Sequence, residues 1–171
     1  MTVAVLRRCL LSVAALFTLC CGYRPLLTGH GGVKSVRLDP VENTTSFPGL
    51  SAEVARGIAV GLRSHDIEIV AAQNPDGWRL SVQVSGLHER VSSMSAVDGK
   101  LLPVDSRWTM EGRMSITSQE GKVVVFQEAV EVSDEAPVTG DLRAEEIAAD
   151  RIRARLAEMF ARWIVTRVLE I

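Results

Sequence analysis

The most reactive side chains in the sequence belong to three cysteines, and all three lie in the first 21 positions. Arg7 and Arg8 precede a short apolar run that ends at Cys20, and Cys21 follows at once. A basic start and an apolar stretch of about 7–15 residues are typical of a secretory signal, and the run is too short to span a bilayer, which needs about 20 residues. A cysteine at the end of such a run can form a thioether with a diacylglyceryl group. The sequence therefore predicts a lipoprotein signal peptide over residues 1–20, with Cys21 lipidated.

Two alternatives to this processing site stay open. The residues before Cys21 are Thr18, Leu19 and Cys20, whereas bacterial lipoproteins prefer leucine at the first of these positions and glycine or alanine at the last. Cleavage before Cys20 would place Phe17, Thr18 and Leu19 there, which is a poorer match. An ordinary secretory signal cut nearby would instead leave a free thiol. In the lipidated form, two or more acyl chains would hold the protein stably on a membrane, because each buried CH₂ contributes about 0.8 kcal/mol.

The titratable side chains elsewhere form no recognisable catalytic pattern. His30, His65 and His88 are far apart in the sequence, and none has a second histidine at metal-ligand spacing. The sequence contains no G-x-S-x-G, P-loop or H-E-x-x-H motif. Asp39 and Glu42 are close together, but two acids beside a turn are more often solvated surface groups. We therefore expect a protein that is not an enzyme and needs no cofactor or metal, with a periplasmic enzyme of unknown type as the less favoured alternative.

Composition limits the class of partner. The chain has 19 Lys and Arg against 21 Asp and Glu, and loss of Arg7 and Arg8 with residues 1–20 leaves 17 against 21, a net charge of −4. Nucleic-acid binding needs a basic surface, so this balance argues against it. The 151 residues that remain are enough for one domain, and no cysteine after Cys21 is present to form a disulfide.

Alternation of polar and apolar residues predicts the strands. We expect strands near 34–39, 67–71, 78–91, 104–117 and 124–132, and a polar loop from Ser92 to Pro103. At Gly86 the alternation changes phase, which indicates a bulge. The clearest alternation is in 104–117, where one face is apolar and comprises Val104, Trp108, Met110, Met114 and Ile116.

Helical spacing predicts two helices. The first begins at Ser51, which can cap it, and buries Val54, Ile58 and Leu62. Gly57 and Gly61 lie four residues apart on this helix and favour close packing against a sheet. The second helix runs from about Leu142 to Leu169 with Asp141 as its cap. Its expected apolar stripe contains Ile147, Ile152, Leu156, Met159, Phe160, Trp163 and Val168.

This order of elements predicts an α+β two-layer sandwich, in which a mainly antiparallel sheet of four to five strands carries two helices on one face. We expect residues 21–32 to form the lipid anchor and tether. Residues 33–171 then form a single α+β domain.

Three short segments match the pattern of a known family. They are Cys21-Gly22-Tyr23-Arg24-Pro25-Leu26, Pro40-Val41-Glu42-Asn43-Thr44-Thr45 before the first helix, and Pro48-Gly49-Leu50 at its start. Together with the order of elements over the whole mature chain, they resemble the lipopolysaccharide-assembly lipoprotein family LptE. The resemblance implies a sheet with two helices on one side and a lipid-anchored location on the periplasmic face of the outer membrane. It also implies a role as plug and assembly partner of the β-barrel LptD in delivering lipopolysaccharide (LPS) to the cell surface.

The same resemblance implies contact with LPS, whose phosphates require arginine or lysine partners. Arg90, Lys100 and Arg107 are the candidates because they flank or occupy the expected loop 92–103, although each could be an ordinary surface charge. The segment 40–45 also resembles the TolB N-terminal-like lipoproteins, some of which activate cell-wall synthases. That alternative would make the protein a regulator of a periplasmic enzyme.

Overall fold

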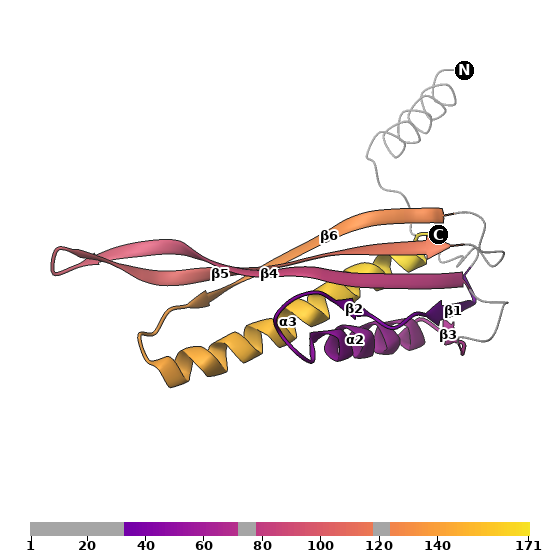
Figure 1. The fold of residues 1–171 in the computed structure, drawn as a ribbon, viewed down its shortest axis with the longest axis horizontal. Coiled ribbons are helices and arrows are strands. Elements are labelled where there is room, and N and C mark those ends of the chain that lie inside the picture. Colours follow the sequence, from indigo (N-terminus) through magenta and orange to yellow (C-terminus); the bar gives the residue numbers. More distant parts are fainter. Residues whose placement is uncertain (1–32, 72–77, 118–123) are drawn as a thin grey trace, which may run out of the picture.

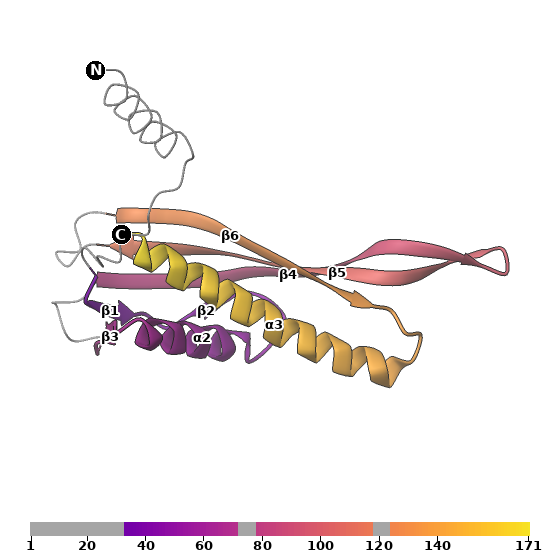
Figure 2. The same ribbon diagram turned by 180° about the vertical axis from the view of Figure 1, so that it is seen from behind.

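The structure is a computed structural model, and it describes residues 33–71, 78–117 and 124–171 (Figure 1). Two layers are present, a sheet and a pair of helices that both cover the same face of it (Figures 1 and 2), which confirms the predicted α+β sandwich. In chain order the elements are β1 (Ser35–Leu38), β2 (Glu42–Asn43), α2 (Leu50–Ser64), β3 (Glu68–Ile69), β4 (Trp78–Val97), β5 (Lys100–Thr117), β6 (Val124–Pro137) and α3 (Leu142–Leu169).

Within the described residues the sheet is mixed and has six strands, one more than the upper number expected. Its order is β3-β1-β4-β5-β6, and β2 pairs with β4 beyond the end of β1. The three long strands β4, β5 and β6 pair antiparallel, whereas β1, β2 and β3 are short and pair in parallel. The additional strand is β2, which lies in a segment rich in turn residues and is too short for alternation to reveal it.

Strands β4 and β5 form one continuous hairpin, so the prediction of a loop over residues 92–103 was wrong. Strand β4 continues to Val97, Asp98 and Gly99 make the turn, and β5 starts at Lys100. Both turn residues have positive φ, 51° and 75°, as a two-residue turn that matches the twist of a hairpin requires. The outer part of this hairpin, residues 91–104, is called the arm here. It projects beyond the rest of the domain (Figure 1).

The core lies between the helices and the inner face of the sheet. The bulge at Gly86 is confirmed, because the register of β4 against β5 shifts between Val84 and Gly86. Alternation was also right for β5 from Trp108 to Ile116, whose even-numbered apolar side chains are buried. Val104 shares that parity but is 39% exposed, because it lies on the arm, where no helix covers the sheet.

Helix α3 has the predicted bounds and cap. The carboxylate of Asp141 accepts hydrogen bonds from the backbone N–H groups of Arg143 and Ala144. The predicted stripe was partly wrong, because Ile147 and Met159 are 49% and 38% exposed. The buried side of α3 is wider than a stripe facing the sheet alone, because α3 packs on both the sheet and α2. Its buried residues are Ile152, Leu156, Ala157, Phe160, Ala161, Ile164, Val165 and Val168.

Helices α2 and α3 lie side by side in very close contact (Figure 2). A Cβ atom added at Gly57 would lie 2.7 Å from the Cβ of Ala161, and one added at Gly61 would lie 2.7 Å from Cγ2 of Val165. The two glycines therefore permit helix-on-helix packing, rather than the helix-on-sheet packing that the sequence suggested. Ser51 is not the cap of α2, because the helix starts at Leu50 behind Gly49, which has a φ of 87°.

We predict that Gly61→Val destabilises the fold by about 1–3 kcal/mol, because its side chain must displace Val165 in a packed contact. This loss should exceed the gain from removing glycine from a helix interior, which for a β-branched replacement is only about 0.3–0.5 kcal/mol. The matched control is Ala52→Val, at an exposed position of α2, which should change stability by no more than about 0.5 kcal/mol. Urea unfolding midpoints measure both variants, and equal losses would contradict the packing argument.

Candidate functional site

The face of the sheet opposite the helices is polar, and its side chains form rows across β4, β5 and β6. In one row Arg90 lies opposite Arg107, which lies opposite Glu135. The next row places His88 opposite Thr109, and the row beyond it places Glu111 opposite Glu131. Because residues two apart on a strand share a face, these side chains lie together on the side away from the core.

Arg90 and Arg107 bring two positive charges directly opposite each other, an arrangement that destabilises a sheet unless the charges are compensated. The guanidinium of Arg107 donates from Nε and Nη2 to Oε1 of Glu135, at 3.0 and 2.7 Å. This pair is exposed and contributes less than about 1 kcal/mol. Arg90 has no ion-pair partner among the residues that the structure describes, so the row carries one uncompensated positive charge.

A hollow of about 380 Å³ lies over these rows, at the base of the arm. Arg90 and Arg107 lie at one end of it, and Glu111 and Glu131 at the other, with the His88 row between them. Its full lining comprises His88, Arg90, Val91, Ser92, Arg107, Thr109, Glu111 and Glu131. The arginine end can hold a phosphate or carboxylate, and the glutamate end can accept hydrogen bonds from hydroxyl groups.

The structure brings together two of the three predicted contact residues. Lys100 is the first residue of β5, at the tip of the arm, and Arg107 lies seven positions further along that strand. Seven residues of extended strand span about 23 Å, so Lys100 cannot share a small ligand with Arg107. The separation follows from the correction to residues 92–103, since a compact loop would have kept the three side chains near one another.

Asp39 lies near the other end of the polar face, in a second hollow of about 310 Å³. Its carboxylate accepts hydrogen bonds from Nε of Arg79 at 2.6 Å and from the hydroxyl of Ser81 at 2.5 Å. Burial raises the pKa of Asp39, but hydrogen bonds from Ser81 and Arg79 and the charges of Arg79 and Arg37 outweigh it and hold the pKa below its usual value. Asp39 therefore ties β4 to the end of β1 rather than being a solvated acid.

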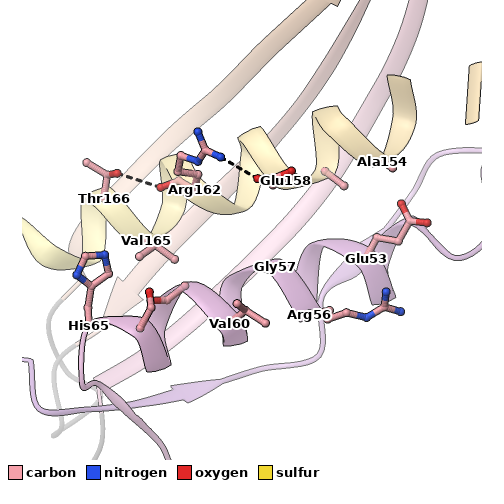
Figure 3. Close-up of a pocket in the computed structure, with 13 residues that line it drawn as sticks. Glu53, Arg56, Gly57, Val60, His65, Ala154, Glu158, Arg162, Val165 and Thr166 are labelled. Carbon is pink, nitrogen blue, oxygen red and sulfur yellow. Dashed lines mark hydrogen bonds and ion pairs between the residues drawn. The ribbon is translucent and has the colours of Figure 1, made fainter. Parts of the chain in front are cut away.

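A groove of about 670 Å³ lies on the opposite side of the molecule, between α2 and α3 (Figure 3). Its lining includes Gly57 and Gly61, which carry no side chains. On its rim Arg162 pairs with Glu158 at 2.7 Å, and the hydroxyl of Thr166 donates to the backbone carbonyl of Arg162 (Figure 3). Glu53, Arg56 and His65 also line the groove.

The structure describes some of the remaining candidate residues and not others. Cys21 and His30 lie outside the described residues. Across 33–71, 78–117 and 124–171, no group of three His, Cys, Asp or Glu side chains is arranged to hold a metal ion. No helix in those ranges combines the length and apolar character needed to cross a membrane.

Sequence reasoning missed His88, Glu111 and Glu131 as members of the hollow. Alternation placed Glu111 and Arg107 on one face of their strand. Which residues of β4 and β6 lie opposite them depends on strand register, however, and no local pattern in the sequence reports it.

Comparison with known proteins identifies related folds. No protein-family model and no curated protein sequence matches the chain. A minor lipoprotein from Acinetobacter baumannii aligns with a TM-score of 0.57 and 12% identity, over 81% of this chain and 92% of that one. A hypothetical protein from Chlamydia trachomatis aligns with a TM-score of 0.53 and 13% identity, over 82% and 100% of the two chains. The rare lipoprotein B from Shewanella oneidensis gives a TM-score of 0.47 and 14% identity, over 80% and 91%.

These similarities establish a fold shared with the first two proteins, one of which is a bacterial lipoprotein. At such low identity they extend to the fold alone. The third TM-score is too low to establish even a common fold.

The lowered pKa of Asp39 makes the stability of the fold depend on pH. Because its folded-state pKa lies below the ordinary value of 3.8, the ionised carboxylate stabilises the fold above about pH 4, and this contribution is lost as the pH falls through the folded-state pKa. Asp39→Asn should therefore be less stable than the wild type at pH 7, and the difference should shrink below pH 3.8. Free energies of unfolding in urea at pH 7, 5 and 3 measure it.

The control is Glu42→Gln, an exposed residue of the same segment, which should change stability at pH 7 by no more than about 0.5 kcal/mol. A deficit of Asp39→Asn that stays constant from pH 7 to pH 3 would contradict the role assigned to the carboxylate.

Proposed function

We propose that this protein is a lipid-anchored protein of the bacterial outer membrane that assists a β-barrel in exporting LPS, as the LptE family does. The observation that carries the proposal is the open polar face of the sheet. On it Arg90 and Arg107 lie side by side in one row, and Glu111 and Glu131 lie side by side two rows away. The role is one of binding and assembly rather than catalysis.

The shape of the domain supports a barrel partner. Both helices cover one face of the sheet and leave the other uncovered by any described element (Figures 1 and 2). That free face consists mostly of serine, threonine, glutamine, histidine and charged side chains along three strands. The lumen of a wide outer-membrane barrel is polar as well, so contacts between the two would be hydrogen bonds rather than apolar packing.

The chemistry of the hollow supports a glycolipid headgroup as the bound molecule. A sugar phosphate presents an anion and several hydroxyl groups within a few ångströms of each other. The anion would lie against Arg90 and Arg107, and the hydroxyl groups would donate to Glu111 and Glu131. A simple anion site would have no use for the two acids, which would repel its ligand.

Lipidation at Cys21 supports the location at a membrane, and it rests on the sequence pattern of residues 1–21. The fold shared with the Acinetobacter lipoprotein is compatible with that location, as an analogy between folds. The location at the outer membrane in particular comes from the resemblance to the LptE family.

We predict that Cys21→Ser abolishes acylation, because only a thiol can form the thioether bond to the diacylglyceryl group. Incorporation of radioactive palmitate into the protein measures this. The matched control is Cys20→Ser, which should keep the label. Equal label in Cys21→Ser and the wild type would contradict lipidation at Cys21, and loss of label in Cys20→Ser alone would move the site to Cys20.

Affinity purification tests the function. The full chain, tagged at its C-terminus and extracted from outer membranes with mild detergent, should recover a large β-barrel protein in near-equal amount together with LPS. Recovery of a penicillin-binding protein without a barrel would contradict the proposal and favour the cell-wall regulator. Recovery of neither class would contradict both.

Two charge-reversal variants test whether the hollow is the contact with LPS. Arg90→Glu should lower the LPS recovered per barrel several-fold, because it places a third acid in the hollow. Arg63→Glu, at an exposed position of α2 on the helical side of the molecule, should leave the recovery unchanged. Equal LPS from the two variants would show that the hollow is not the LPS contact.

A further inference from the structure

The second hollow, which contains Asp39, also holds polar side chains that bind nothing else in the described part of the chain. At its edge Asp39, Arg79 and Ser81 are bound to one another. Four further polar side chains of its lining make no hydrogen bond or ion pair with any described residue. They are Gln83 of β4, Arg113 and Ser115 of β5, and Gln127 of β6.

Strand register gathers these four side chains into two neighbouring rows. Gln83 lies opposite Arg113, and Ser115 lies opposite Gln127. Side chains opposite each other on one face have Cβ atoms about 5 Å apart. The next row on the same face lies about 7 Å further along the strand. Their amide, hydroxyl and guanidinium groups can therefore contact one small ring together.

The second hollow continues the first hollow, which lies beside Arg90, along the same face. Glu111 lines the first hollow and Arg113 the second, and they are two positions apart on β5. Opposite Glu111 is Gly86, and the imidazole of His88 lies over it, because a Cβ atom added at Gly86 would be 2.7 Å from Nε2 of His88. The boundary between the two hollows is therefore polar as well.

Together the two hollows are longer than one sugar phosphate. From Arg107 in the first hollow to Ser115 in the second, β5 advances eight positions, or about 27 Å of extended strand. A sugar phosphate in the first hollow leaves the second one empty. A longer glycan attached to that sugar can lie over both.

The chemistry of the second hollow differs from that of the first. It has a single unpaired arginine, and the acids Asp39 and Glu42 belong to the same lining, so it carries no excess of positive charge for another phosphate. Its amide and hydroxyl groups both donate and accept hydrogen bonds, as the hydroxyl groups of sugars do. An acyl chain would leave these groups without hydrogen bonds, which is unfavourable. The lining is therefore suited to sugar rings.

We propose that the second hollow is a subsite for sugars, so that the free face of the sheet binds a phosphorylated oligosaccharide across both hollows. The phosphate lies against Arg90 and Arg107, and the sugars that follow it lie toward Gln127. This inference rests on the proposed function, and it names the part of the glycolipid that the second hollow takes.

Two soluble ligands test the subsite. The short ligand is the phosphorylated disaccharide of LPS with its acyl chains removed. The long ligand is the same disaccharide, also deacylated, with the core sugars of LPS attached. The full chain, extracted from membranes in mild detergent, should bind the long ligand several-fold more tightly than the short one in isothermal titration calorimetry.

Single substitutions separate the two hollows. Gln127→Ala and Arg113→Ala should each lower the affinity for the long ligand several-fold and leave the affinity for the short ligand unchanged. Both residues are exposed, so the variants should fold normally, as circular dichroism can verify. Arg90→Ala should weaken the binding of both ligands. The matched control Arg63→Ala, at an exposed position of α2, should weaken neither.

Three results would overturn the inference. The first is equal affinity of the wild type for the two ligands, or binding of neither. In the second, Gln127→Ala and Arg113→Ala weaken the binding of both ligands equally, so the second hollow is not a separate subsite. In the third, these variants leave both affinities unchanged but lower the recovery of a barrel in the affinity purification, which would make the second hollow a contact with the barrel wall.

The inference and the proposed function fail separately. Recovery of a barrel with LPS, together with equal affinities for the two ligands, would leave the proposed function standing without the subsite. A preference for the long ligand that Gln127→Ala removes, without recovery of a barrel, would leave the subsite standing without the role in export.

Discussion

Close contact between α2 and α3 is the constraint on which the rest of the structure depends. Gly57 and Gly61 leave no room for a Cβ atom against Ala161 and Val165, so the two helices fit side by side over one face of the sheet. One face can then supply the whole core, in which Phe160 and Met110 are fully buried. Because both helices occupy that face, the other face of the long strands is left to polar side chains, and the candidate site exists because of this division.

Strand register assembles the site on the free face. Three antiparallel strands bring Arg90, Arg107 and Glu135 into one row and Glu111 and Glu131 into another, although these residues are spread over 46 positions of the chain. A sheet places such groups on a rigid surface, where a ligand finds a positive end and an acidic end already formed. This preorganisation fits a binding protein better than the polar loop that residues 92–103 were expected to form.

The arm has a different physical character from the domain that carries it. Beyond Val104, whose carbonyl accepts a hydrogen bond from the N–H of Val138, each of its strands has a single described neighbour and no helix beneath it. Its six exposed apolar side chains therefore contribute little to the core and are available to a partner. The polar hollow and the apolar arm adjoin at Arg90 and Val91, so one hairpin carries two surfaces with distinct chemistry.

Local patterns in the sequence were enough for the class of fold, the covered parts of the three long strands, the bulge at Gly86 and the cap of α3 at Asp141, because burial on one face imposes a period and a cap needs only its own turn. They did not reveal that β4 and β5 continue through residues 92–103. The tertiary structure alone decided which surfaces meet. It added β2, turned Gly57 and Gly61 toward α3, and set Arg90 opposite Arg107. Register, helix contacts and the reach of a hairpin depend on pairing between segments far apart in the chain, and periodicity along one segment carries no information about its partner.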